Sequence, residues 1–77
     1  MHTAHHVDLA ARVTRLVRAS AAERVDAPDR RFVLSAGTRL LLIGHRPDPL
    51  HGELAEVEPL DGPHEGERLL VFPENVL

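Results

Sequence analysis

The chain has 77 residues, no cysteine and a formal net charge of −3 at pH 7. A chain of this length forms one small domain of marginal stability, because it buries only about 60% of the surface that it exposes when unfolded. The composition excludes disulfides and thiolate chemistry, and no stretch approaches the roughly 20 apolar residues of a membrane-spanning helix. The first residues do not resemble a signal peptide, so we expect a cytoplasmic protein without a membrane partner.

Charge is distributed unevenly along the chain. Residues 1–31 carry six arginines against four acids, for a net charge of +2, and residues 32–77 carry three arginines against eight acids, for a net charge of −5. A basic front and an acidic body argue against a domain that wraps a nucleic acid with its whole surface.

The first predicted element is an amphipathic helix over residues 7–25, preceded by a flexible N-terminus at residues 1–6. Apolar side chains recur there at helical spacing, at Leu9, Val13, Leu16 and Val17. Pro28 and the aspartates on either side of it favour a turn that ends the helix. Residues 26–30 are therefore predicted to be a linker.

Three arginines lie on the opposite side of this predicted helix, namely Arg12, Arg15 and Arg18. Such a cationic strip can bind an acidic protein or the phosphate backbone of a nucleic acid. It can equally be a solvated helix face. We take the three arginines as candidates for contact with a partner.

Residues 31–77 have the pattern of a small antiparallel β-barrel or sandwich. Four short apolar or alternating runs, punctuated by glycine and proline, predict strands: "RFVLS" (31–35), "TRLLLIG" (38–44), "GELAEVE" (52–58) and "ERLLVF" (67–72). Two of these runs contain "LLLI" and "LLVF", which are apolar on both faces and need a cover on the second face of the sheet. We expect the helix to be that cover, since an undocked helix would leave an apolar stripe for a partner or a second copy.

Motifs in this part of the chain resemble those of small SH3-like barrels. They are "GTRLLLIG" (37–44), "GELAEV" (52–57) and "LVFPENVL" (70–77). The pattern is similar to the β-subunit barrel of nitrile hydratase, the stromal SH3-like subunit of the photosystem and the variable chain of ferredoxin–thioredoxin reductase. It is closer to a short SH3-like domain of unknown function from high-GC Gram-positive bacteria. The resemblance covers residues 37–77 only and implies no activity. Together with the apolar run at residues 31–35, it predicts an SH3-like barrel of about five strands over residues 31–77.

The ending "FPENVL" also resembles the "F-P-S-N-Y-V" ending of eukaryotic SH3 domains, where a 3₁₀ turn leads into the last strand. Proline-rich peptides dock there on grooves lined by aromatic side chains. This chain has no tryptophan, no tyrosine and only two phenylalanines. The resemblance therefore implies the turn, and the peptide-binding function is not carried over.

The stretch "GHRPDPLHGE" at residues 44–53 is predicted to be the first long loop of this barrel. Pro47 and Pro49 lack an N–H group, which opposes pairing of the loop into a hairpin. Long loops on small barrels often carry binding residues. The loop candidates for contact with a partner are His45, Arg46, Asp48 and His51.

The six histidines raise the alternative of a metal-handling protein, although their spacing supports it poorly. His45 and His51 flank an aspartate and His64 could supply a third nitrogen, but a structural zinc site usually has four ligands in closely spaced pairs. No nucleophile motif such as G-x-S-x-G and no glycine-rich phosphate loop occurs. We therefore expect no enzyme, no cofactor and no metal site.

The sequence as a whole predicts a mainly β protein, an SH3-like barrel of about five strands preceded by one amphipathic helix. Its expected function is that of a non-enzymatic accessory or adaptor domain, which binds another protein through the arginine-lined helix and the 44–53 loop. The alternatives are nucleic-acid binding by the arginine strip and metal handling by the loop histidines.

Overall fold

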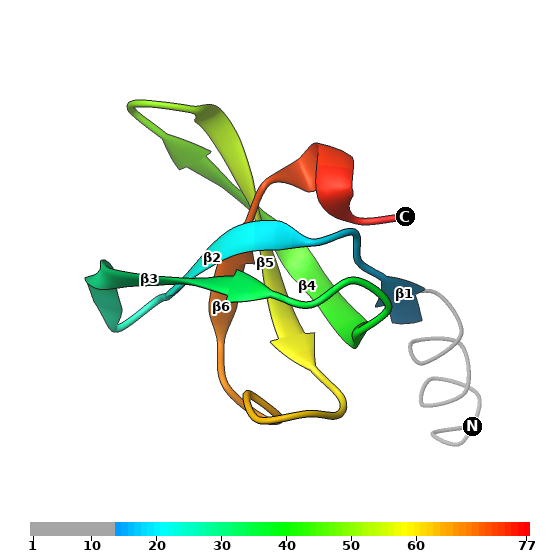
Figure 1. Ribbon diagram of the computed structural model, residues 1–77. Helices are drawn as coiled ribbons and strands as arrows, with labels where there is room; N and C mark the ends of the chain where they lie inside the picture. The colour runs from blue at the N-terminus through cyan, green and yellow to red at the C-terminus, as the bar shows by residue number, and fades with distance from the viewer. Residues whose placement is uncertain (1–13) are drawn as a thin grey trace, which may run out of the picture.

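The computed structural model describes residues 14–77, which form one antiparallel sheet of six strands (Figure 1). The strands are β1 (Thr14–Leu16), β2 (Ser20–Arg24), β3 (Ala27–Leu34), β4 (Arg39–Asp48), β5 (Gly52–Pro59) and β6 (Leu69–Val71). Their order across the sheet is β1-β4-β5-β6-β2-β3, and the prediction of a mainly β protein is confirmed. Among the described residues, no helix is long and apolar enough to cross a bilayer.

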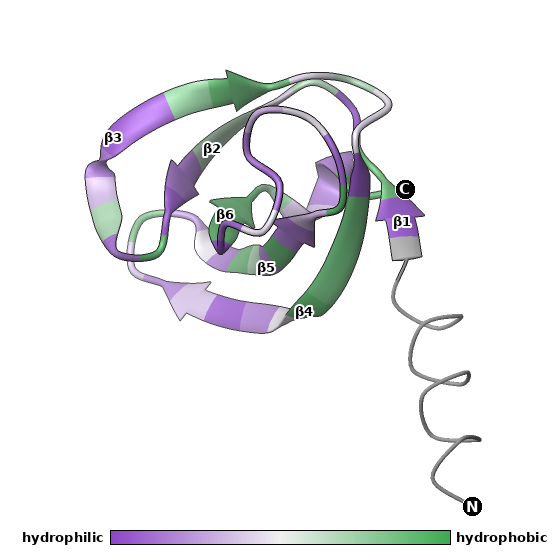
Figure 2. Cartoon of the chain, turned by 90° about the horizontal axis from the view of Figure 1, so that it is seen from below, coloured by the Kyte–Doolittle hydropathy of each residue, from purple (hydrophilic) through white to green (hydrophobic). Residues whose placement is uncertain are grey.

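The sheet curls around its own apolar interior, as Figure 2 shows. A bridge between Val17 and Val76 joins the start of the described chain to its end, and the N–H of Gly37 donates to the carbonyl of Val17 at 2.8 Å. The buried core consists of Val17, Ala22, Leu34, Leu40, Ala55, Val57, Leu69 and Val71. Among the described residues, the fully buried core consists of aliphatic side chains, and Phe32, Leu42 and Val76 pack against it while only partly buried.

The amphipathic helix predicted over residues 7–25 is wrong for its described part. Residues 14–16 form β1 and residues 20–24 form β2, while residues 7–13 lie outside the described residues. β2 is an interior strand that pairs with β3 on one side and with β6 on the other. A helix here would leave both of those strand edges unpaired. Pairing on both sides therefore outweighs the modest helical preference of the alanines in this segment.

Residues 26–30, predicted to be a linker, instead complete a hairpin between β2 and β3. β3 begins at Ala27, and Pro28 lies near the start of this edge strand, where a missing N–H group is tolerated. The four strands predicted from residue 31 onward correspond to β3, β4, β5 and β6. The sheet has six strands rather than the five predicted, because β1 and β2 occupy the segment that was expected to be helical.

A 3₁₀ turn, η1 (Pro73–Asn75), follows β6, as the ending "FPENVL" implies. The N–H of Val76 donates to the carbonyl of Pro73 at 3.1 Å, and the N–H of Arg18 donates to the carbonyl of Asn75 at 2.7 Å. The Asn75 amide Nδ2 donates to Ser20 Oγ at 3.0 Å. The turn therefore fastens the end of the described chain to the start of β2.

The prediction that residues 44–53 form an open loop is wrong. β4 and β5 pair with each other as far as Asp48 and Gly52, and only the short turn at residues 49–51 separates them. Pro47 takes part in this pairing, because only alternate residues of an antiparallel ladder direct an N–H toward the partner strand. Among the described residues, β1 pairs only with residues 39–41 of β4. Pro47 therefore lies on a part of β4 that is open on that side, where a proline leaves the ladder with β5 intact.

Gly52, the first residue of β5 after this turn, lies in the left-handed backbone region, with a φ of 82°. We expect Gly52→Ala to lower the free energy of unfolding by about 1–2 kcal/mol, because a Cβ disfavours this conformation. Space is not the reason, since an added Cβ would meet nothing within 4 Å. Urea unfolding followed by circular dichroism measures the loss.

Gly44→Ala is the matched control for this prediction. Gly44 lies in β4 with equally open space around it and a φ outside the left-handed region. Its replacement should change the free energy of unfolding by less than about 0.5 kcal/mol. Equal losses for the two variants would show that the backbone conformation of Gly52 is not what matters.

Candidate functional site

The outer face of the sheet, opposite the core, carries two rows of side chains that cross the strands. Directly paired residues of antiparallel strands project from the same face. The pairing places one row across β5, β6, β2 and β3, made of Glu56, Leu70, Glu23 and Arg31. Two residues away on β5, β2 and β3 lies the second row, made of Leu54, Ala21 and Val33, and Phe72, directly after the end of β6, lines the same groove. The first row is mostly charged, whereas the second is entirely apolar.

The apolar row is covered at one end and open at the other. Leu54 is only 6% exposed although it lies on the outer face. Beside it, His51 from the turn between β4 and β5 packs edge-on against Phe72, with ring centroids 5.1 Å apart. Val33 lies at the far end, on β3, and is 71% exposed. The row therefore runs from a sheltered end to solvent at the edge of the sheet.

Between the β2–β3 and β4–β5 hairpins the outer face is hollowed into a shallow depression, which we call the outer groove. Its lining consists of Ala21, Ala22, Glu23, Arg31, His51, Leu54, Leu70, Val71 and Phe72. The cavity volume is about 30 Å³, room for only a few water molecules. Pockets for small ligands are roughly ten times larger or more. The outer groove therefore suits a protruding side chain of a partner better than a small substrate.

An ion-pair cluster lies beside the outer groove on β5. The Glu56 side chain is 12% exposed, and it accepts hydrogen bonds from Arg68 Nη1 at 2.8 Å and from Arg46 Nε at 3.0 Å. The hydrogen bond from Arg68, with the contribution of Arg46, outweighs partial burial and lowers the pKa of Glu56. The carboxylate consequently stays ionised at pH values where an ordinary glutamate begins to protonate.

The turn between β4 and β5 holds His51 in place at the outer groove. Asp48 Oδ2 accepts hydrogen bonds from the N–H groups of Leu50 at 3.1 Å and His51 at 2.9 Å, and it lies 2.8 Å from His51 Nδ1. The contact with the His51 side chain, joined by these backbone bonds, lowers the pKa of Asp48 despite partial desolvation. Aspartate closes turns in this way with its own side chain, and here it also orients the imidazole.

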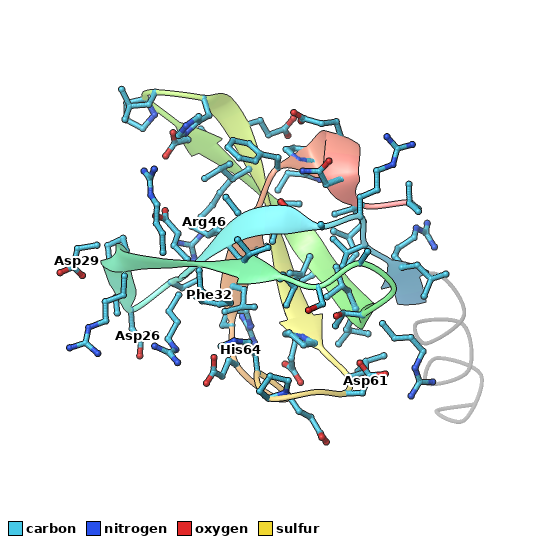
Figure 3. The ribbon with its side chains drawn as sticks, in the orientation of Figure 1. Asp26, Asp29, Phe32, Arg46, Asp61 and His64 are labelled. Atoms are coloured by element: carbon cyan, nitrogen blue, oxygen red, sulfur yellow. The ribbon has the colours of Figure 1, made fainter. Side chains whose placement is uncertain are left out.

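A second cluster joins the segment between β5 and β6 to the β2–β3 hairpin (Figure 3). The His64 ring stacks on Phe32 with centroids 4.0 Å apart and an interplanar angle of 19°. Glu67 accepts hydrogen bonds from Arg24 Nε and Nη2 at 3.1 and 3.3 Å, and its Oε1 lies 3.0 Å from His64 Nδ1. The Arg24 bonds, followed by the His64 contact, lower the pKa of Glu67. Because its charged groups satisfy one another, we assign this cluster to the stability of the fold.

Three of the four loop residues predicted to contact a partner lie at or beside the outer groove. His51 lines it, Asp48 orients His51, and Arg46 forms its ion pair beside it. His45 is exposed on β4 and, as the neighbour of Arg46 in the strand, projects from the other side of the hairpin. Contact of these residues with a partner stays a prediction.

The arginine strip predicted at Arg12, Arg15 and Arg18 is not a helical surface in the described chain. Arg12 lies outside the described residues, Arg15 belongs to β1, and Arg18 is exposed between β1 and β2. Strands place side chains on one face every second residue, so a spacing of three does not align them. Their contact with a partner stays a prediction, now without the helix that was expected to align them.

Within residues 14–77, no group of three histidine, cysteine or acidic side chains is placed to hold a metal ion. His45 is exposed on β4, His51 is bonded to Asp48, and His64 stacks on Phe32. The metal-handling alternative therefore has no ligand set in this part of the chain.

Of the residues that line the outer groove, only His51 was predicted as a site residue. Among those that were missed, Leu54, Leu70 and Phe72 are the large apolar ones. A signal was present, because Leu54 breaks the alternation of "GELAEVE" and "LLVF" is apolar on both faces. The second faces of these strands were expected to pack under a helix. They line the outer groove instead, so a strand with two apolar faces can indicate a surface site as well as a covered one.

No protein-family model matches the chain, and comparisons with curated proteins and with solved structures find no match. What the structure supports is a small, barrel-like antiparallel sheet. The function proposed below consequently depends on the geometry of the outer groove.

Proposed function

We propose that this protein is a non-enzymatic accessory domain that binds another protein through the outer groove. The observation that carries this proposal is the apolar row from Leu54 on β5 through Phe72 and Ala21 to Val33 on β3, which reaches solvent at Val33. Exposed apolar surface with a polar rim is typical of protein-interaction sites. Glu23, Arg31 and Glu56 of the neighbouring row provide that rim.

Two further features support binding rather than catalysis. The cavity volume of about 30 Å³ leaves no room for a substrate of ordinary size. Two carboxylates beside the outer groove, Glu56 and Asp48, have lowered pKa values and are engaged in hydrogen bonds. A general acid or base at neutral pH needs a pKa near the working pH instead.

We also propose that the fold is an SH3-like barrel. The consecutive pairing of β4, β5 and β6, the turn η1 and the bridge between Val17 and Val76 support this proposal. The motif resemblance supports a bacterial accessory role, and a sequence without cysteine is compatible with the reducing cytoplasm.

Selection from a random peptide library displayed on phage tests the proposed function, with the full chain as the target. We expect enriched peptides to shift the backbone amide NMR signals of outer-groove residues. Ala21→Arg should weaken their binding by about tenfold or more, because a long charged side chain would fill the apolar row. Ala21 is exposed, so the variant should keep its fold.

Ala36→Arg is the matched control, since Ala36 is an exposed alanine between β3 and β4, away from the groove lining. It should leave peptide affinity unchanged, and the NMR spectra of both variants report whether they are folded. A selection that enriches no peptide would contradict the proposed function. So would enriched peptides that bind the Ala21→Arg variant as tightly as the wild type.

A further inference from the structure

β3 forms one edge of the sheet and runs along the outside of the curl in Figure 2. Among the described residues it pairs with β2 alone, and no strand lies on its other side. An edge of eight residues presents backbone N–H and C=O groups to solvent, and such edges can accept an added strand from another chain.

Both rows of the outer face end at this edge. The apolar row ends at Val33, and the charged row ends at Arg31, whose side chain is 63% exposed. A strand added to β3 would contribute the next member of each row, because paired residues project from the same face. One added side chain would lie beside Val33, and another, two residues away, would lie beside Arg31.

The edge is cationic where the rows end. Arg30 and Arg31 are both exposed. Arg31 Nε lies 3.5 Å from a carboxylate oxygen of Glu23, and Arg30 has no ion-pair partner among residues 14–77. The other acids of this hairpin, Asp26 and Asp29, lie toward its outer end (Figure 3). Acidic residues placed opposite the two arginines would therefore be attracted, and basic ones repelled.

A second copy of this chain is a poor occupant of the edge. Antiparallel pairing of two β3 strands along their length brings Arg30 and Arg31 of one copy against the same arginines of the other. Like charges directly opposite each other destabilise a sheet. Arg30 and Arg31 instead attract an acidic segment to this edge.

We infer that the partner presents an extended acidic–apolar segment, which adds to β3 as a further strand. Opposite Val33 the segment carries an apolar residue, and opposite Arg31 and Arg30 it carries acidic residues. The segment therefore has an apolar residue at one position, any residue at the next position, opposite Phe32, and acidic residues at the two positions after that. This inference rests on the proposed function and specifies the class of partner that the outer groove takes.

The peptides enriched by the phage selection serve as the probes, resynthesised with an N-methyl group at one backbone position at a time. Because an added strand bonds through the N–H of alternate residues only, methylation at every second position should lower the affinity by about tenfold or more. Methylation at the intervening positions should change it little. Fluorescence polarisation measures each affinity.

Charge reversal tests the chemistry of the segment. Arg30→Glu should lower the affinity for the enriched peptides about fivefold, whereas Arg30→Lys, which keeps the positive charge at the same position, should leave it nearly unchanged. Enriched peptides without acidic residues, or peptides that tolerate methylation at every position while still mapping to the outer groove, would overturn the inference and leave the proposed function standing. An empty selection would overturn the proposed function and the inference with it.

Discussion

Leu69→Ala is expected to lower the free energy of unfolding by about 2–5 kcal/mol. Leu69 is fully buried in the centre of the core. Its strand lies between two others, where Leu69 is opposite Arg24 of β2 and Val57 of β5. Because β6 is hydrogen-bonded to a strand on each side, its backbone cannot shift to fill the cavity that the truncated side chain leaves. Because a small domain has a total stability near the lower end of about 5–15 kcal/mol, this loss should leave a large unfolded population at 37 °C.

Thermal unfolding by calorimetry or circular dichroism measures this effect. For a domain of this size, each kcal/mol corresponds to a change of about 4–8 °C in Tm. Leu50→Ala is the matched control, since the same atoms are removed from a turn side chain that is 83% exposed. The control should remain within about 0.5 kcal/mol of the wild type. Similar Tm losses in the two variants would be incompatible with a core centred on Leu69.

The second large effect is expected for Phe32→Ala. Phe32 is half-buried, packs against the core and stacks on His64, so it links the β2–β3 hairpin to the segment between β5 and β6. We expect a loss of about 2 kcal/mol, less than the roughly 3–5 kcal/mol typical of a fully buried phenylalanine. Removal of the Phe32 ring should also make the segment around Gly66 more mobile. The N–H of Gly66 donates to the carbonyl of Pro59 at 3.0 Å.

Urea unfolding gives the free energy for this variant, and amide hydrogen exchange at Gly66 gives the local effect. Phe32→Leu is the control, because leucine keeps an apolar contact with the core and loses only the stacked ring. It should be destabilised by about half as much as Phe32→Ala. Unchanged exchange at Gly66 in Phe32→Ala would show that the stack does not hold this segment.

The strands from residue 31 onward could be predicted because their signals are local. Alternation in "GELAEVE" and glycines at the strand ends identify β5 and its neighbours within short windows. The segment containing β1 and β2 could not be predicted in this way. Leu16 and Val17 fit a helical stripe equally well, and the choice is made by pairing with β4, β6 and Val76, which lie far away in the sequence.

The part of the candidate site that lies in the turn between β4 and β5 could be predicted from the residues of that turn. Proline, aspartate and histidine in "GHRPDPLHGE" indicated a functional connection, and the structure places His51 of that stretch at the outer groove. The prediction of an open loop was wrong, because Pro47 disrupts strand pairing only on the side toward which its N–H group would have pointed. Leu70 and Phe72 could not be assigned to a surface groove, since only the curl of the sheet decides which apolar face is inside.

The bridge between Val17 and Val76, together with the pairing of β2 with β6, sets the order of events during synthesis. Ribosomes add about 5–20 residues per second, and sheets made of such distant pairings fold in roughly milliseconds to seconds. The β2–β3 hairpin therefore emerges well before its inner edge can be covered by β6. We expect the domain to fold in one late step, after residues 69–76 have left the ribosome. Until then, the charged side chains of the β2–β3 hairpin must prevent its exposed edge from pairing with other chains.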